Sequence, residues 1–213
     1  LTVSDNGIGM TAEEMEANLG VIAKSGSLAF KKDLDAAEKD KANIDVIGQF
    51  GVGFYSAFMV AEKVAVVSRA YGQETANRWE SEGADGYTIT PCEKETVGTD
   101  VILTMKPDTE DDCYSVYLMP WKIQELVKKY SDYVRWPIRT DVETTEKYET
   151  GDVDEAGIQK MGVRTVTKEE VVNSMIPIWQ RSKKEASDAD CIAFYKEKFR
   201  DTEDPVSVIR VNA

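Results

Sequence analysis

The spacing of apolar and polar residues at the start of the sequence predicts a short strand followed by a helix. Residues 1–4 are strand-like and run into the turn sequence Asp-Asn-Gly. A helix is expected next, because Thr11 and Glu14 have the spacing of a capping box. The residues that then recur at helical spacing are Met15, Leu19 and Ile22. Gly20 is expected to weaken or end this helix.

The middle of the sequence predicts a second helix and several consecutive strands. The apolar stretch at residues 54–60 indicates a buried helix. Short apolar and β-branched runs, separated by turns, predict strands at residues 64–70, 77–80, 87–90 and 99–105. Side chains two positions apart share one face of a strand, and in the last strand these are Val101, Leu103 and Met105.

The last part of the sequence changes character twice. Residues 121–130 predict an amphipathic helix, and the residues expected to face inward from it are Ile123, Leu126, Val127 and Tyr130. A strand is expected to start at residues 136–138. Residues 141–170 are polar and acidic with little periodicity, which indicates a linker. A further domain is expected from Val171, on the strength of the aromatic residues Trp179, Phe194, Tyr195 and Phe199.

Composition narrows the possible functions. The 213 residues carry 26 Lys and Arg against 39 Asp and Glu, and the net charge of −13 argues against nucleic-acid binding, which needs a basic face. The sequence has no histidine, which excludes within it a Ser-His-Asp triad and any His-ligated metal site. Three cysteines without paired spacing indicate reduced thiols in a cytosolic protein. No apolar run approaches the roughly 20 residues that span a bilayer.

The ends of the sequence indicate a piece of a larger protein. The first residue is Leu1, and no signal-peptide pattern follows it. Residues 1–4 and 206–213 are both strand-like. We therefore expect an internal fragment, with groups outside it needed for activity.

Two glycine motifs are the leading candidates for a ligand site. In the Asp-x-Gly-x-Gly string at residues 5–9, a carboxylate on a turn can accept a hydrogen bond from an exocyclic amine, and the glycines let a flat ring approach the backbone. In the Gly-x-x-Gly-x-Gly string at residues 48–53, backbone N–H groups can cradle phosphate oxygens. Each motif is expected by chance in about 7% of such chains, and both together in far fewer. Tight turns without a ligand are the alternative for each.

A third feature is the pair Gly98 and Thr99, just before the last predicted strand of the sheet. A hydroxyl at this place can support the Asp5 carboxylate or an ordered water. Taken alone the pair is weak, because most Gly-Thr pairs are turns.

Other nucleotide-binding motifs fit less well. Residues 7–12 match the dinucleotide fingerprint G-x-G-x-x-A, but residues 24–41 lack the second apolar strand and terminal acid that a Rossmann unit requires. The P-loop string G-x-x-x-x-G-K-[ST] does not occur in the sequence. The H-R-D signature of protein kinases is impossible without histidine.

Five strings follow one another in a recognisable order, at residues 5–10, 22–26, 48–56, 79–81 and 98–99. In this order they resemble the nucleotide-binding domain of the heat-shock protein 90 chaperones, closest to the bacterial HtpG type. The string at residues 48–56 is the most specific. Residues 173–184 resemble the start of the chaperone's middle domain. The wider superfamily, which shares the acidic-glycine motif, contains gyrase B-type ATPases, MutL and histidine kinases.

The resemblance implies a fold and a domain order. The fold is a two-layer α/β sandwich of the gyrase, heat-shock-90, histidine-kinase and MutL ATPase type, incomplete at its N-terminus, with a mostly antiparallel sheet. Residues 1–145 would be the partial nucleotide-binding domain, residues 146–170 the linker and residues 171–213 the start of the middle domain. ATP or ADP with Mg²⁺ would lie between the helices and the sheet.

The resemblance also implies roles for residues of the base pocket. Asp5 would bind the adenine amino group, with Thr99 supporting that carboxylate. Gly9 would help through a bound water, and Met10 would line the pocket. From the residues alone, Met10 and Phe54 each have the alternative of being an ordinary core residue.

Further positions are implied for the ribose and the phosphates. Asn18 would contact the ribose or phosphate region and Lys24 the phosphates, although a solvated lysine and a polar helix-face residue are the ordinary alternatives. The residues implied for the lid and the phosphate loop are Ser25, Gly26, Gly51, Val52, Gly53 and Phe54. ATP would close the lid over residues 24–53 and so couple hydrolysis to client handling.

No catalytic or metal-binding residue is assigned within the 213 residues. The family's general-base Glu and Mg²⁺-binding Asn lie on a helix before the Asp-x-Gly-x-Gly motif, hence before Leu1, and its phosphate-sensing Arg would follow Ala213. Hydrolysis needs an activated water and stabilised phosphoryl charge. We therefore expect these residues alone to hydrolyse ATP poorly or not at all.

The function implied is that of an ATP-dependent molecular chaperone that assists protein folding and conformational maturation. Such a protein would be a cytoplasmic homodimer with client proteins as partners, binding neither nucleic acid nor membrane. A DNA-topology or mismatch-repair ATPase of the same superfamily is the alternative, and the acidic charge argues against it. A third possibility is a non-catalytic interaction module whose glycine loops bind nothing.

Overall fold

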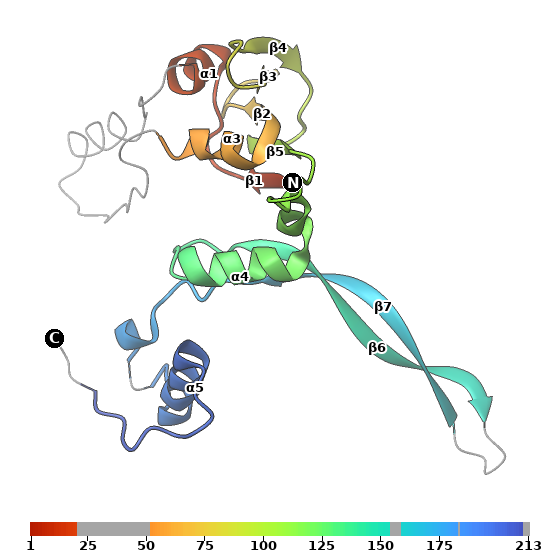
Figure 1. Ribbon diagram of the computed structural model, residues 1–213, viewed down its shortest axis with the longest axis vertical. Coiled ribbons are helices and arrows are strands. Elements are labelled where there is room, and N and C mark those ends of the chain that lie inside the picture. The colour runs from red at the N-terminus through yellow and green to blue at the C-terminus, as the bar shows by residue number, and fades with distance from the viewer. Residues whose placement is uncertain (21–51, 154–158, 183, 211–213) are drawn as a thin grey trace. The chain divides into compact units, whose positions relative to one another are not determined.

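The chain forms two compact units, Leu1–Leu118 and Met119–Ala213. The structure, a computed structural model, describes residues 1–20, 52–153, 159–182 and 184–210 (Figure 1). The first unit contains a five-stranded sheet with helices, and the second contains a long hairpin with two helices.

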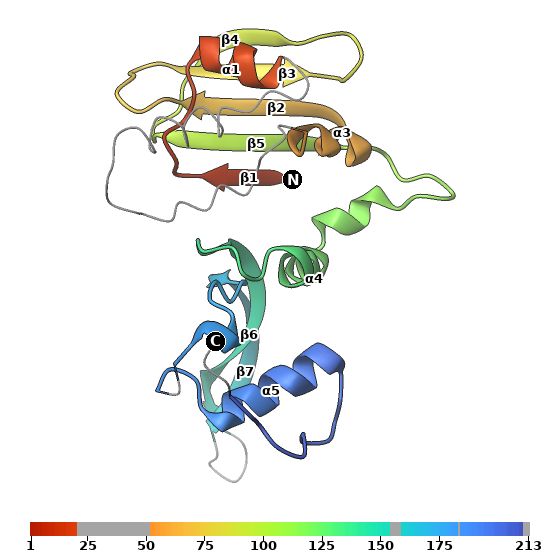
Figure 2. The ribbon, with the colours of Figure 1, turned by 90° about the vertical axis from the view of Figure 1, so that its left-hand side faces the viewer.

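The sheet of the first unit is antiparallel at every pair of neighbouring strands. Figure 2 shows its strands side by side, with β1 at one edge and β4 at the other. In spatial order the strands are β1 (Thr2–Asp5), β5 (Gly98–Met105), β2 (Ala61–Arg69), β3 (Ala76–Ser81) and β4 (Thr88–Cys92). The strands predicted from sequence are therefore confirmed, with ends shifted by a few residues.

Helices pack on one face of this sheet and close the hydrophobic core. They are α1 (Ala12–Leu19), the 3₁₀-helix η1 (Phe54–Ser56) and α3 (Ala57–Val60). Met15 and Leu19 of α1 are buried against Val64, Val66 and Trp79 of the sheet. The apolar face of the helix, with a period of 3.6 residues, packs on the apolar face of the strands, with a period of 2. The first unit is therefore a two-layer α/β sandwich.

The start and end of α1 follow the predicted signals. The Thr11 hydroxyl accepts a hydrogen bond from the Glu14 N–H at 3.3 Å, and the Glu14 carboxylate accepts one from the Thr11 N–H at 2.8 Å. Gly20 caps the C-terminal end. Ile22, the third residue of the predicted helical pattern, lies outside the described residues.

The apolar stretch at residues 54–60 is helical as predicted, but it is only half-buried. It divides into η1 and α3, and the side chain of Met59 is 72% exposed. The 3₁₀-helix η2 (Tyr114–Leu118) ends the first unit.

The second unit is built from α4 (Pro120–Tyr130), the strands β6 (Arg139–Val153) and β7 (Gln159–Val171), the 3₁₀-helix η3 (Ile178–Gln180) and α5 (Asp188–Phe199). The predicted amphipathic helix is confirmed, with three of its expected inward residues half-buried. Tyr130 is the exception: its side chain is 71% exposed, so the expectation for it is wrong. Its position at the last turn of α4 places it beyond the packed part of the helix.

The acidic stretch expected to be a linker without periodicity forms most of an antiparallel hairpin. β6 and β7 pair from Arg139 opposite Val171 to Glu149 opposite Met161. Both faces of this two-stranded ribbon are largely exposed, so neither face requires the apolar alternation by which strands are recognised. The functional division at residues 145 and 170 stays a prediction.

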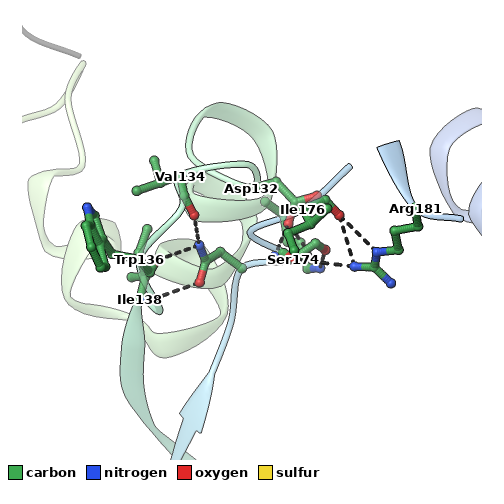
Figure 3. Close-up of polar contacts among 9 residues, drawn as sticks. Asp132, Val134, Trp136, Ile138, Ser174, Ile176 and Arg181 are labelled. Carbon is green, nitrogen blue, oxygen red and sulfur yellow. Dashed lines mark hydrogen bonds and ion pairs between the residues drawn. The ribbon is translucent and has the colours of Figure 1, made fainter. Parts of the chain in front are cut away.

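A buried asparagine joins the two ends of the hairpin. Asn173 accepts a hydrogen bond from the Ile138 N–H at 2.8 Å and donates to the carbonyls of Val134 and Trp136 at 2.8 and 3.0 Å. Nearby, the Arg181 guanidinium donates to the Ile176 carbonyl at 3.0 Å (Figure 3). These bonds satisfy backbone groups at the points where the chain enters and leaves the ribbon.

Candidate functional site

Three polar residues lie in a row across three neighbouring strands at one end of the first unit's sheet. Asp5 of β1 is directly opposite Thr99 of β5, and Thr99 is directly opposite Ser68 of β2. Residues paired in this way point to the same face. Two positions further along the strands, the same face carries Val66 and Val101, which belong to the core under the helices. The row therefore lies at the polar end of the helix-covered face.

The carboxylate of Asp5 is held by two backbone donors. Its Oδ1 accepts a hydrogen bond from the Gly7 N–H at 2.8 Å and another from the Thr99 N–H at 3.3 Å. No residue in the described part of the chain donates to Oδ2. A carboxylate fixed through one oxygen presents the other to a ligand, and that oxygen can only accept hydrogen bonds when ionised.

The loop after Asp5 packs directly on the end of β2. Gly9 has φ +67°, and a Cβ there would lie 2.0 Å from the Arg69 carbonyl oxygen, so no other residue fits. The Tyr71 N–H donates to the Ile8 carbonyl at 2.7 Å, and the Met10 N–H donates to the Ser68 hydroxyl at 2.8 Å. The glycines of the Asp-x-Gly-x-Gly string thus bring the loop's backbone against the sheet.

A second glycine brings the backbone of β5 against Asp5 itself. Gly98 has φ +126°, and a Cβ there would lie 2.1 Å from the Asp5 carbonyl oxygen. This close approach lets the Thr99 N–H reach the Asp5 carboxylate. The Gly98 and Thr99 pair, weak as a sequence signal, is therefore part of the same arrangement.

The Thr99 hydroxyl does not bond to Asp5 but to Ser68. Its Oγ1 lies 2.9 Å from the Ser68 Oγ, and Ser68 in turn donates to the Gly98 carbonyl at 3.2 Å. Ser68 was not among the candidate residues from sequence. The sequence offers only a weak indication of its role. Ser68 follows Val64 and Val66 at the next inward position of the strand, where an apolar residue is expected, so a polar residue is unusual there.

The other candidate residues within the described ranges lie on the helix layer. Met10 and Phe54 both pack against the core, and the ring of Phe54 contacts Trp79 edge to face at 5.5 Å. Asn18 is half-buried on α1, and Val52 is exposed. The Gly53 carbonyl accepts a hydrogen bond from the Ser56 hydroxyl at 2.6 Å. No hydrogen bond among described residues links these groups to Asp5.

η1 and α1 are connected by a half-buried hydroxyl. The Tyr55 hydroxyl donates to the Leu19 carbonyl at 2.9 Å, at the C-terminal end of α1. Burial raises the pKa of this hydroxyl above its ordinary value, and the nearby Tyr87 raises it further. Tyr55 is therefore a neutral donor that fixes the helices to each other. Four candidate residues lie outside the described residues: Lys24, Ser25, Gly26 and Gly51.

The described residues contain neither a cluster that could bind a metal ion nor a helix that could span a membrane. Within the described ranges, no three His, Cys, Asp or Glu side chains are grouped so as to hold a metal ion. Among the helices that the structure describes, none is both long and apolar enough to cross a membrane.

A cavity of ≈ 340 Å³ lies in the second unit, where the Arg210 guanidinium is already bonded to the Ala186 carbonyl and to Asp188. It contains none of the candidate residues.

Two family models match the chain. The family described as "Histidine kinase-, DNA gyrase B-, and HSP90-like ATPase" matches residues 1–101, which include the row of Asp5, Thr99 and Ser68. The family described as "Hsp90 protein" matches residues 146–213. The first match confirms the fold class expected from sequence, and it agrees with the antiparallel sheet and helix layer of the first unit.

Curated relatives match the chain from end to end. The chaperone protein HtpG of Bacillus subtilis is 50% identical over 212 residues, and that of Natranaerobius thermophilus is 49% identical over 213 residues. Each alignment covers 100% of this chain and 32% of the relative. The HtpG of Clostridium perfringens is 49% identical over 93% of the chain and 30% of its own length. The chain thus spans about a third of the length of these relatives.

Proposed function

The chain belongs to the heat-shock protein 90 family, and from this premise we propose that it contains the nucleotide-binding region of an ATP-dependent molecular chaperone. The relatives that it matches are named as chaperones, and the family matched by residues 1–101 is one of ATPases. A DNA-topology or mismatch-repair enzyme is less well supported, because residues 146–213 match the Hsp90 family.

The observation that carries the proposal is the Asp5 carboxylate, held through Oδ1 and without a donor to Oδ2 among the residues that the structure describes. The adenine amino group donates a hydrogen bond to Oδ2. Gly9, whose backbone reaches the sheet, leaves room for the ring and holds a bound water, and Met10 forms an apolar wall. The Thr99 N–H keeps the carboxylate in place.

The ribose and phosphates extend from this pocket along the helix layer. We assign Asn18 and Lys24 to the ribose and phosphates. The lid and phosphate loop comprise Ser25, Gly26, Gly51, Val52, Gly53 and Phe54. Support for these roles comes from the family membership and, for Phe54, from its place on the same core as Met10. Mg²⁺ enters with the nucleotide and neutralises phosphate charge.

For the whole protein we propose ATP hydrolysis that drives the folding and maturation of client proteins. Such a protein acts as a homodimer in the cytoplasm and binds neither nucleic acid nor membrane. The 213 residues hold no group to which the family's general base is assigned, so a polypeptide of these residues binds nucleotide but turns it over slowly. A steady-state rate equal to that of a complete relative contradicts this last point.

Thermal unfolding with and without Mg-ADP tests the binding site. Ligand at 100 times its dissociation constant adds about 2.7 kcal/mol to the unfolding free energy, which is several degrees in melting temperature for a chain of this size. We expect this shift in the parent and its loss in Asp5→Asn, which replaces the accepting oxygen or turns a donor toward the amine. Asp111→Asn, a change of the same charge at an exposed site, is the control and keeps the shift. No shift in a folded parent overturns the proposal.

A further inference from the structure

The buried hydroxyl of Ser68 has three hydrogen-bond partners at once. Its residue is 0% exposed. The Oγ lies 2.8 Å from the Met10 nitrogen, 2.9 Å from the Thr99 Oγ1 and 3.2 Å from the Gly98 carbonyl oxygen. Water has no access to this hydroxyl, so these three groups determine where its hydrogen points.

Only one arrangement of hydrogens satisfies all three contacts. A serine hydroxyl has one hydrogen to donate and two lone pairs to accept with. The Met10 N–H can only donate, so it occupies one lone pair. The Gly98 carbonyl can only accept, so it takes the Ser68 hydrogen. The remaining lone pair of Ser68 must therefore accept the hydrogen of the Thr99 hydroxyl.

This arrangement fixes what Thr99 offers to a ligand. With its hydrogen given to Ser68, the Thr99 Oγ1 has only lone pairs left. The Asp5 carboxylate beside it also has only lone pairs. The side chains of Asp5 and Thr99 thus present acceptors alone, which suit an amino group of the ring and repel a carbonyl oxygen at the same position.

We propose that Ser68 is a positioning residue that makes the pocket selective for an amino-bearing over an oxo-bearing purine, by holding the Thr99 hydroxyl hydrogen away from the ligand. The inference rests on the proposed function, since it concerns the same base pocket. Asp5 already disfavours the oxo ring, and Ser68 adds to this by preventing Thr99 from turning its hydrogen toward the ring oxygen.

The test compares ADP with inosine diphosphate, which carries a carbonyl in place of the amino group and a hydrogen on the neighbouring ring nitrogen N1. Isothermal titration with Mg²⁺ gives the ratio of the two dissociation constants, a quantity that does not change when a variant weakens both nucleotides equally. In Ser68→Ala, Thr99 is free to donate, so we expect the selectivity for ADP to fall about three- to tenfold.

A double-mutant cycle shows whether Ser68 acts through Thr99. In a Thr99→Val background no hydroxyl remains to be oriented, so adding Ser68→Ala should leave the selectivity unchanged. Ser68→Thr keeps the hydroxyl and should keep the parent's selectivity. If Ser68→Ala does not fold, Ser68→Cys serves in its place, because a thiol donates and accepts weakly and should also lower the selectivity.

The outcomes separate this inference from the proposed function. A folded parent that binds neither nucleotide overturns both. If the parent binds ADP and Ser68→Ala weakens the binding of both nucleotides by the same factor, the inference alone is overturned. Ser68 then only supports the fold. An equal loss of selectivity from Ser68→Ala with and without the Thr99 hydroxyl also overturns it.

Discussion

The Thr99 N–H donates a hydrogen bond to the Asp5 Oδ1 at 3.3 Å, across the pairing of β5 with β1. The bond joins two residues that are 94 positions apart in the sequence. It places a carboxylate at the end of the sheet face that the helices cover, with one oxygen fixed and the other without a donor in the described part of the chain. The proposed nucleotide site depends on this pairing.

The Gly98→Ala substitution tests the close approach that makes this bond possible. A Cβ at Gly98 would lie 2.1 Å from the Asp5 carbonyl oxygen, and the backbone has φ +126°. We expect a loss of about 3 kcal/mol in unfolding free energy and loss of ADP binding. Gly72→Ala is the matched control, because Gly72 also has a positive φ, +80°, but nothing within 4 Å. Its cost should be about 1 kcal/mol, with binding retained. Equal effects of the two substitutions in urea unfolding argue against the close approach.

Removing the N-terminal cap of α1 should loosen the helix layer. Thr11→Ala loses the hydroxyl that accepts the Glu14 N–H, and we expect a cost of about 1 kcal/mol in chemical unfolding. Thr11→Ser keeps the hydroxyl and should lie within a few tenths of the parent. A cost as large for the serine variant as for the alanine variant means that the Thr11 methyl, not the cap, is what matters.

Glu80 on β3 gives the first unit a specific acid sensitivity. Hydrogen bonds from Lys63 first and Arg78 second hold the pKa of this carboxyl below its ordinary value of 4.5. Because the pKa of Glu80 is lower in the folded than in the unfolded protein, its ion pairs contribute their full stabilisation above pH 4.5. This stabilisation is lost as the pH falls through the pKa of the folded state. The groups are partly exposed, so the contribution is about 1 kcal/mol or less.

The measurement for Glu80 is a difference curve. The unfolding free energies of the parent and of Glu80→Gln are measured from about pH 7 down to about pH 3. Their difference should shrink as the pH falls. In a Lys63→Gln, Arg78→Gln background the difference should be small at every pH. A difference that grows in acid contradicts the assignment.

Asn173 should control the base of the hairpin in the second unit. Asn173→Ala leaves the Ile138 N–H and the Val134 carbonyl without their partner, and we expect a cost of about 2 to 4 kcal/mol. Amide hydrogen exchange at Ile138 should accelerate. In Asn173→Asp the acceptor for Ile138 is kept while both donated bonds are lost, so exchange at Ile138 should be slowed relative to the alanine variant. Unchanged exchange at Ile138 in both variants shows that other contacts hold the hairpin.

Much of the first unit could be predicted from local pattern, because its sheet has one covered face. Val64 and Val66 lie two positions apart on the covered face, and Met15 and Leu19 recur at helical spacing. Turn and cap residues, such as Thr11 and Gly20, then mark the ends of elements. These signals are local in sequence, so the helices and strands could be predicted without knowing which elements they pack against.

The hairpin and Ser68 could not be found in the same way. The ribbon of β6 and β7 has no buried face, so apolar alternation is absent, and its cross-strand contacts, such as the Tyr148 ring over Gly162, depend on register. Ser68 is identified by its three partners, which are up to 58 positions away. Asp5 was recognisable because its glycine motif is contiguous, whereas the hydroxyl network behind it is assembled only by folding.

The most direct test of the central claim is to follow the backbone amides of Gly7 and Thr99 by ¹⁵N NMR while Mg-ADP is added. Both amides donate to the Asp5 Oδ1, so a ligand that bonds to the same carboxylate must change their environment. We expect both signals, and that of Met10, to shift with one common saturation curve, and the shifts to be lost in Asp5→Asn. Saturable binding of ADP that leaves Gly7 and Thr99 unmoved contradicts the proposed site.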